Sequence, residues 1–133
     1  YEEIEDNQVL LTSDTIVAFE NQILHKPKDY DDAFQMLRKL SGNTHQVYTG
    51  ICIKTYNKTF TTSDCADVEF AELSDEEIDF YIKTYKPFDK AGGYGVQEWI
   101  GMSKISKITG SYYTIMGLPT HLVYSILKNF EFD

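Results

Sequence analysis

The feature that most limits the fold of this chain is a pair of long β-rich segments in its middle. They cover Gln46–Thr55 and Thr59–Phe70, and only Tyr56-Asn57-Lys58 separates them. Two such runs joined by a short polar connection are typical of an antiparallel hairpin, because so short a connection lets consecutive strands pair directly. We therefore predict one long hairpin over residues 46–70.

Shorter runs rich in β-branched and other apolar residues predict further strands. Near the start of the chain, Ser13-Asp14 interrupts such a run, and the turn Glu20-Asn21-Gln22 lets the following residues pair back. Gly110 separates two short runs later in the chain. The strands predicted in this way are Gln8–Thr12, Thr15–Phe19, Ile23-Leu24, Ile105–Ile108 and Tyr112–Met116.

Apolar residues at helical spacing predict three helices. The first covers Asp29–Leu40, with Asp29 as its cap and Gly42 as a left-handed stop. Ser74 opens a capping box for the second helix, which ends at Pro87. Pro119 suits the first turn of the third helix. The residues that this last helix is predicted to bury are Leu122, Val123, Ile126, Leu127 and Phe130.

The predicted strands and helices alternate, with the hairpin inserted among them. This order indicates an α/β or mixed α+β fold. No repeat, low-complexity tract or linker interrupts the 133 residues, so we expect a single domain over residues 1–133.

The chain is acidic, with 12 Lys and Arg residues against 21 Asp and Glu residues and a net charge of −9. An acidic surface repels a polyphosphate backbone, so the charge argues against general binding of nucleic acids. A single small anion can still bind where a few lysines are focused in a cleft and a divalent cation offsets the charge of the ligand.

The sequence also bears on the compartment. No apolar run approaches the ~20 residues that span a bilayer, and no secretory signal is visible. Cys52 and Cys65 lack a metal-binding spacing, and we interpret both as small buried apolar residues. We therefore expect a cytoplasmic protein that does not bind membranes.

One candidate for chemistry is the stretch Thr12-Ser13-Asp14-Thr15, which places a carboxylate inside an apolar strand region. Burying that carboxylate without partners would be costly. The stretch is then either a strand-end turn or bulge, or the position of a metal ligand or general base at the edge of a sheet.

A second candidate is Lys26. Pro27 stiffens the chain and favours an extended conformation at Lys26, just before a helix begins. A lysine held in this way can contact a phosphate, although a solvated surface lysine would look the same in the sequence.

The third candidate is the glycine-rich segment Asp89–Gln97, which has three glycines within four positions behind Lys90. Glycines allow close backbone approach and the positive φ angles of anion-binding loops. A simple turn would have a similar composition, and the order of residues is not that of a Walker A loop.

Five segments taken together resemble the Maf family of nucleoside triphosphate pyrophosphatases, in the order of that family. They are Ser13-Asp14-Thr15-Ile16-Val17, Lys26-Pro27, residues 40–50, residues 89–97 and residues 110–119. Ser41 and His45 lie in the longest of these segments, residues 40–50. Both look structural there, as a helix stop and a turn, and no third group stands at a spacing that would make them part of a catalytic triad.

The resemblance implies a Maf fold, with a mixed twisted sheet flanked by helices, and a metal-dependent enzyme. Such an enzyme would cut a nucleoside triphosphate into the monophosphate and pyrophosphate with Mg²⁺ or Mn²⁺. The Gly-Tyr-Gly-Val-Gln stretch that ends at Gln97 resembles the branch that acts on dTTP, UTP and modified uridine nucleotides.

The resemblance also implies roles for individual residues. Asp14 would be the catalytic carboxylate, activating water or holding the metal ion. Lys26 would contact the phosphates, Gln97 would help to hold substrate or water, and Lys90 would shape the rim of the cleft. Members of the family are often dimers, so a homodimer is part of the expectation.

The main departure from the family is at the start, since the chain begins at Tyr1, just before the strand that carries Asp14. In the family a strand, a Ser-x-x-Arg loop, a helix, an acidic loop and a further lysine precede that point. We therefore expect an N-terminal part of the fold to be missing and the chain alone to be inactive or weakly active. A non-catalytic nucleotide-binding or regulatory module in septum formation is the alternative.

Overall fold

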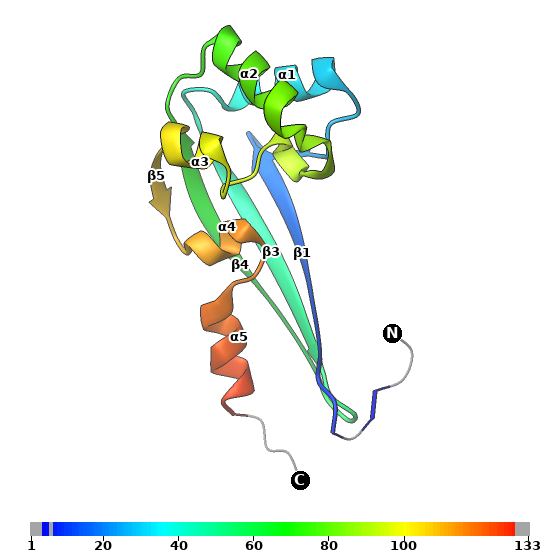
Figure 1. The fold of residues 1–133 in the computed structure, drawn as a ribbon. Coiled ribbons are helices and arrows are strands. Elements are labelled where there is room, and N and C mark those ends of the chain that lie inside the picture. Colours follow the sequence, from blue (N-terminus) through cyan, green and yellow to red (C-terminus); the bar gives the residue numbers. More distant parts are fainter. Residues whose placement is uncertain (1–3, 6, 130–133) are drawn as a thin grey trace.

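The structure is a computed structural model that describes residues 4–5 and 7–129. Its five described strands form one twisted sheet in the order β2-β1-β3-β4-β5, and every neighbouring pair is antiparallel (Figure 1). The strands are β1 (Leu10–Phe19), β2 (Gln22–Leu24), β3 (Thr44–Lys54), β4 (Thr59–Phe70) and β5 (Ile105–Thr109).

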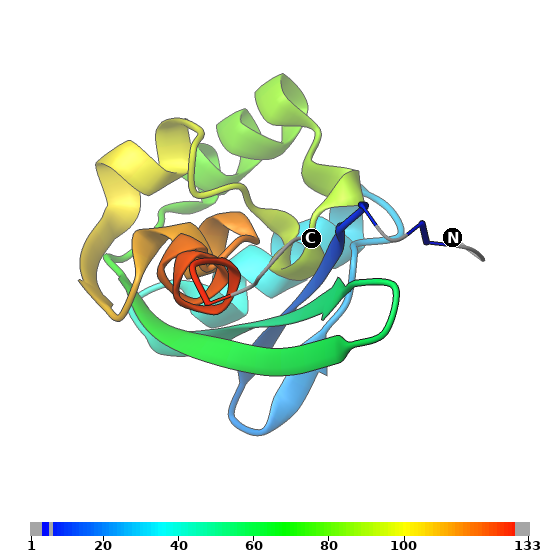
Figure 2. The same cartoon turned by 90° about the horizontal axis from the view of Figure 1, so that it is seen from below.

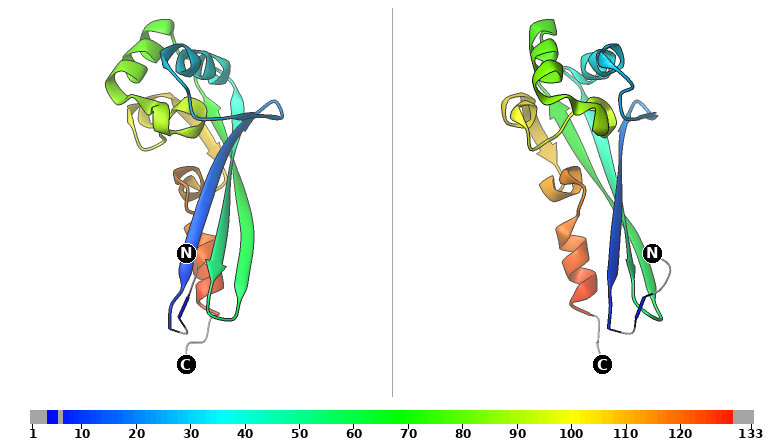
Figure 3. Two further views of the ribbon diagram at one scale, coloured as in Figure 1. Left: turned by 90° about the vertical axis from the view of Figure 1, so that its right-hand side faces the viewer. Right: turned by 45° about the vertical axis from the view of Figure 1, so that its right-hand side comes forward.

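The helices gather on one side of this sheet, as the view from below and the side views show (Figures 2 and 3). None of the described helices is long and apolar enough to cross a membrane. They are α1 (Tyr30–Leu40), α2 (Asp75–Tyr85), α3 (Trp99–Lys104), α4 (Tyr112–Met116) and α5 (Thr120–Leu127), with short 3₁₀ turns at Pro87–Asp89 and Ala91–Gly93.

The two faces of the sheet differ because successive side chains of a strand point to opposite sides. Val17, Val47 and Ala66 are paired across β1, β3 and β4 and are all buried under the helices. Their neighbours on the other face, Tyr48 and Cys65, are exposed. The prediction that Cys65 is buried is therefore wrong, because it lies on the uncovered face.

Most of the predicted elements are confirmed. β3 and β4 form the long hairpin, and β2 pairs back onto β1. Asp29 caps α1 by accepting the backbone N–H of Asp32 at 2.9 Å, and Gly42 follows the helix with a φ of 69°. Ser74 forms both bonds of the predicted capping box at the start of α2. The mixed α/β fold class is likewise confirmed, although no parallel pair occurs among the described strands.

The predicted interruption at Ser13-Asp14 is wrong. β1 runs without a break from Leu10 to Phe19, and each residue from Leu10 to Ala18 is paired in register with β3. The long hairpin provides a continuous backbone ladder for β1, so the polar residues at this point do not need to leave the sheet.

The end of the chain also differs from the prediction. Tyr112–Met116 is a short helix rather than a strand, because Ser111 caps it by accepting the N–H of Tyr113 at 3.2 Å. Five residues are too few for their periodicity to separate strand from helix. In α5 the apolar residues Leu122, Val123, Ile126 and Leu127 are half-buried, and none is fully buried. Phe130, which was predicted to be buried too, lies outside the described residues.

A buried polar pair joins β3 to the segment after α2. His45 is fully buried, and its Nε2 lies 2.6 Å from the hydroxyl of Tyr94. The ring of Phe70 packs against both, with centroid distances of 5.3 Å to His45 and 5.0 Å to Tyr94. Burial lowers the pKa of His45 to about 4 from an ordinary value of 6.5. The structural interpretation of His45 is therefore favoured over a catalytic one.

This burial predicts how stability depends on pH. Between pH 6.5 and about 4 the unfolded chain protonates His45 and the folded chain does not, so stability falls as the pH drops through this window. Across this window the free energy of unfolding falls by about 3 kcal/mol. Urea unfolding at several pH values would measure it, and His45→Leu should flatten the slope relative to the parent chain.

His25→Gln is the matched control, because His25 is exposed, and its slope should equal that of the parent chain. An unchanged slope in His45→Leu would show that His45 is not the group responsible.

Candidate functional site

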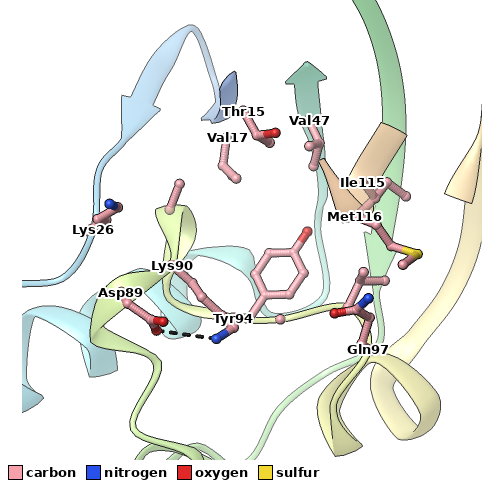
Figure 4. Close-up of a pocket in the computed structure, with 13 residues that line it drawn as sticks. Thr15, Val17, Lys26, Val47, Asp89, Lys90, Tyr94, Gln97, Ile115 and Met116 are labelled. Atoms are coloured by element: carbon pink, nitrogen blue, oxygen red, sulfur yellow. Dashed lines mark hydrogen bonds and ion pairs between the residues drawn. The ribbon is translucent and has the colours of Figure 1, made fainter. Parts of the chain in front are cut away.

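The largest concentration of predicted site residues lies around a pocket of about 310 Å³ on the covered face of the sheet. β1 and β3 form one wall, the glycine-rich segment forms the second, and α4 forms the third (Figure 4). The lining residues are Thr15, Val17, Lys26, Val47, Asp89, Lys90, Ala91, Tyr94, Gly95, Val96, Gln97, Ile115 and Met116.

The glycine-rich segment packs directly onto β1. Gly92 has a φ of 75°, and a Cβ there would lie only 3.0 Å from Cγ1 of Val17. Its backbone N–H donates to the carbonyl of His25 at 3.2 Å, which ties the segment to the chain just before Lys26. Only glycine combines this backbone conformation with so close an approach, so the sequence requirement here is steric.

The far end of the segment is held by Tyr81 of α2, which is fully buried. Its hydroxyl accepts the backbone N–H of Gly95 at 2.9 Å and donates to the carboxylate of Glu98 at 2.5 Å. Burial and the bond to Glu98 raise the pKa of Tyr81, so the phenol stays protonated at neutral pH. The backbone between Gly95 and Glu98, which carries Gln97, is therefore fixed to the helical layer.

Two lysines bring positive charge to the pocket from different parts of the chain. Lys26 follows β2 and precedes the buried Pro27, whereas Lys90 sits between the two 3₁₀ turns. The Nζ atom of Lys90 lies 3.3 Å from the carboxylate of Asp89. The bond to Lys90 is the main reason why the pKa of Asp89 is lowered, and the more distant charge of Lys26 adds to the effect.

The structure thus brings together three of the four predicted site residues, Lys26, Lys90 and Gln97, around one pocket. Figure 4 shows Lys26 at the left of the pocket, Gln97 and Met116 at the right, and the ring of Tyr94 between them. One end of the pocket is cationic, and the other combines an amide with apolar side chains.

Asp14 does not converge with these residues, which corrects the expected arrangement. Thr15 and Val17 line the pocket, so the regular alternation of β1 turns Asp14 to the opposite, uncovered face. There Asp14 lines a shallow depression with Thr12 and Cys52. A break in the strand at Ser13-Asp14 could have turned the carboxylate towards the pocket, but the ladder to β3 is continuous.

A metal site is not preformed in the part of the chain that the structure describes. No group of three or more His, Cys, Asp or Glu side chains lies close enough together there to hold a metal ion. Asp14 would supply a single carboxylate, and Mg²⁺ bound by so few protein ligands depends on substrate phosphates and water. Because the pocket and Asp14 lie on different faces of the sheet, the described residues do not fit a metal ion that contacts both Asp14 and a ligand in the pocket.

Sequence reasoning missed several residues that line the pocket. Thr15 was seen only as a hydroxyl beside Asp14, although its alternation with the apolar Val17 marks it as facing the covered side. Ile115 and Met116 were assigned to a strand, and the helix α4 turns both towards the pocket. Tyr94 was noted only as part of the glycine-rich segment.

A chain of hydroxyl groups connects the pocket to α4. The Oγ1 atoms of Thr15 and Thr49 are 2.8 Å apart, and Thr49 donates to the backbone carbonyl of Thr114 at 2.7 Å. Thr49 and Thr114 are fully buried. The hydroxyl of Thr114 donates in turn to Asp64 at 2.6 Å, so β1, β3, β4 and α4 share one polar network.

Comparison with known proteins agrees with the sequence resemblance. The profile of the family described as Maf-like protein matches residues 1–130. A dTTP/UTP pyrophosphatase of Flavobacterium psychrophilum is 56% identical over 126 residues, which are 95% of this chain and 65% of that protein. Proteins of the same name from Porphyromonas gingivalis and Phocaeicola vulgatus are each 52% identical, over 96% and 92% of this chain and 64% and 63% of their own lengths. The chain thus spans somewhat less than two thirds of these relatives, and it belongs to the Maf family.

Proposed function

We propose that this protein is a nucleoside triphosphate pyrophosphatase that converts dTTP and UTP to the monophosphate and pyrophosphate. The observation that carries the proposal is the meeting of Lys26, Lys90 and Gln97 at one pocket. The relatives named dTTP/UTP pyrophosphatase, which share about half of their residues with this chain, support the choice of substrate. Modified pyrimidine nucleotides belong to the same proposal.

The charges around the pocket suit a triphosphate. In a chain with a net charge of −9, the lining of this pocket has two lysines against the single carboxylate of Asp89, so its net charge is positive. Attack of water at the α-phosphorus increases the negative charge on the phosphoryl oxygens, which Lys26 and Lys90 would stabilise. The ion pair with Asp89 would keep Lys90 oriented before a ligand arrives.

For Asp14 we propose the role of water-activating carboxylate and of ligand to Mg²⁺ or Mn²⁺, as the family resemblance implies. Asp14 is exposed, and β2 pairs with β1 only at residues 17–19, so no described strand lies beside this part of β1 on its outer edge. Because Asp14 and the pocket lie on different faces, this role requires the triphosphate to reach around the open edge of β1.

The same position of Asp14 favours a second candidate function. A pocket that holds a nucleotide without a carboxylate close to the phosphates would bind and not hydrolyse. In that case the protein would be a nucleotide-binding or regulatory module, and a role in septum formation is the form that the family resemblance suggests.

We also propose a cytoplasmic location and a homodimer. Support for the dimer comes from apolar side chains on the uncovered face of the sheet, where Ile16, Ile23 and Tyr48 are 38%, 51% and 41% exposed. Adjacent exposed apolar side chains of this kind are common at contacts between subunits.

The first prediction concerns binding. Lys26→Ala should weaken the Mg²⁺-dependent binding of a non-hydrolysable dTTP analogue roughly tenfold, because a charge-assisted contact to phosphate is lost. Isothermal titration calorimetry would measure the change. Lys28→Ala is the control, since Lys28 is exposed two residues away and does not line the pocket. Equal affinities of the two variants would contradict the role of Lys26.

The second prediction concerns the reaction. At high protein concentration, dTTP should yield dTMP and pyrophosphate, and chelation of divalent cations should stop the reaction. Asp14→Asn should lower the rate at least about a hundredfold if Asp14 activates water. Asp67→Asn is the control, because Asp67 lies on the same face of the sheet in β4.

Release of dTDP and phosphate would refute the proposed bond cleavage. Undiminished turnover by Asp14→Asn would refute only the role of Asp14, and binding without turnover by the parent chain would support the non-catalytic alternative.

A further inference from the structure

The proton of the Thr15 hydroxyl is already used in a hydrogen bond within the protein. A threonine hydroxyl has one proton to donate and two lone pairs to accept with. Thr49 donates its proton to the carbonyl of Thr114, so the 2.8 Å contact between Thr15 and Thr49 requires Thr15 to donate. Thr15 is therefore left with lone pairs only, and its half-buried side chain lines the pocket.

Apart from its bond to Thr49, Thr15 shares this part of the pocket lining with apolar side chains. Val17 lies two residues further along β1, and Val47 is its partner in β3. Ile115 and Met116 line the pocket from α4. A phosphate would meet lone pairs, hydrocarbon and the uncharged amide of Gln97 at this end, whereas the lysines lie along the glycine-rich segment and the chain after β2 (Figure 4). Resting on the proposed function, this arrangement assigns the nucleobase to the Thr15 end and the triphosphate to the lysine end.

We propose that Thr15 selects uracil and thymine by accepting a hydrogen bond from their N3–H group. Cytosine has an unprotonated N3, so its lone pair would face the lone pairs of Thr15. Reversing the hydroxyl chain to relieve this contact would break the bond from Thr49 into α4. The facing lone pairs and the loss of the Thr49 bond both weaken the binding of cytosine, because a polar site rejects a ligand that leaves its groups unpaired.

The other polar groups of the pocket do not duplicate this role. The hydroxyl of Tyr94 is engaged with His45 at 2.6 Å, and the carboxylate of Asp89 is paired with Lys90. Gln97 can donate to a base carbonyl as well as accept, so it does not by itself distinguish the bases. Met116 is flexible and can adapt to the presence or absence of the methyl group of thymine.

The test compares the affinities of non-hydrolysable analogues of UTP, CTP and 3-methyl-UTP in the presence of Mg²⁺, measured by isothermal titration calorimetry. The parent chain should bind UTP roughly tenfold more tightly than the other two, since one hydrogen bond differs. Thr15→Val should lose this preference through weaker binding of UTP, and Thr15→Ser, which retains the hydroxyl, should keep it. Thr15→Ala serves as the second variant if the valine change disturbs folding.

Thr12→Val is the matched control, because Thr12 lies on the opposite face of the same strand and should leave the preference unchanged. A Thr15→Val or Thr15→Ala variant that keeps the full preference for UTP would overturn the inference, as would a parent chain that binds all three nucleotides equally. Failure of the parent chain to bind any of the three would instead overturn the proposed function, and the inference with it.

Discussion

The in-register ladder between β1 and β3 is the constraint on which the rest of the site depends. It pairs Leu10 through Ala18 with β3 without a bulge, so the side of the sheet reached by each residue of β1 is fixed by its position alone. Thr15 and Val17 face the pocket for this reason, and Asp14 faces away. A shift of one residue would exchange the two sets of side chains completely.

Around this ladder, the pocket is assembled from parts of the chain that are distant in the sequence. The glycine-rich segment rests on Val17, α4 is bonded to β3 through Thr49, and Lys26 follows the short strand β2. The contacts of Gly92 with Val17 and of Thr49 with α4 both join the helical side to the same face of the sheet. The other face has no described element packed against it, and it carries Asp14 together with exposed apolar side chains.

Much of the fold could be predicted because its signals are local. The long hairpin, the Asp29 cap and the Ser74 capping box each depend on a few neighbouring residues. The direction of Asp14 could not be predicted, since it depends on whether β1 continues through Ser13-Asp14, and pairing with β3 decides that. The helix α4 was mistaken for a strand because five residues carry too little periodicity. Lys26 and the segment that contains Lys90 and Gln97 stood out in the sequence itself, but a surface lysine and a simple turn would have looked the same, so it was the family resemblance that favoured a site.

The hydrogen bonds of Tyr81 have a consequence for how the pocket can change. A buried phenol on α2 holds both Gly95 and Glu98, so the rim of the pocket has its anchor inside the hydrophobic interior. The apolar side of α2 packs against α1, so the bonds from Tyr81 attach the rim of the pocket to a well-packed part of the interior. Substitutions in the interior, away from the pocket, can therefore alter recognition by moving the backbone that carries Gln97.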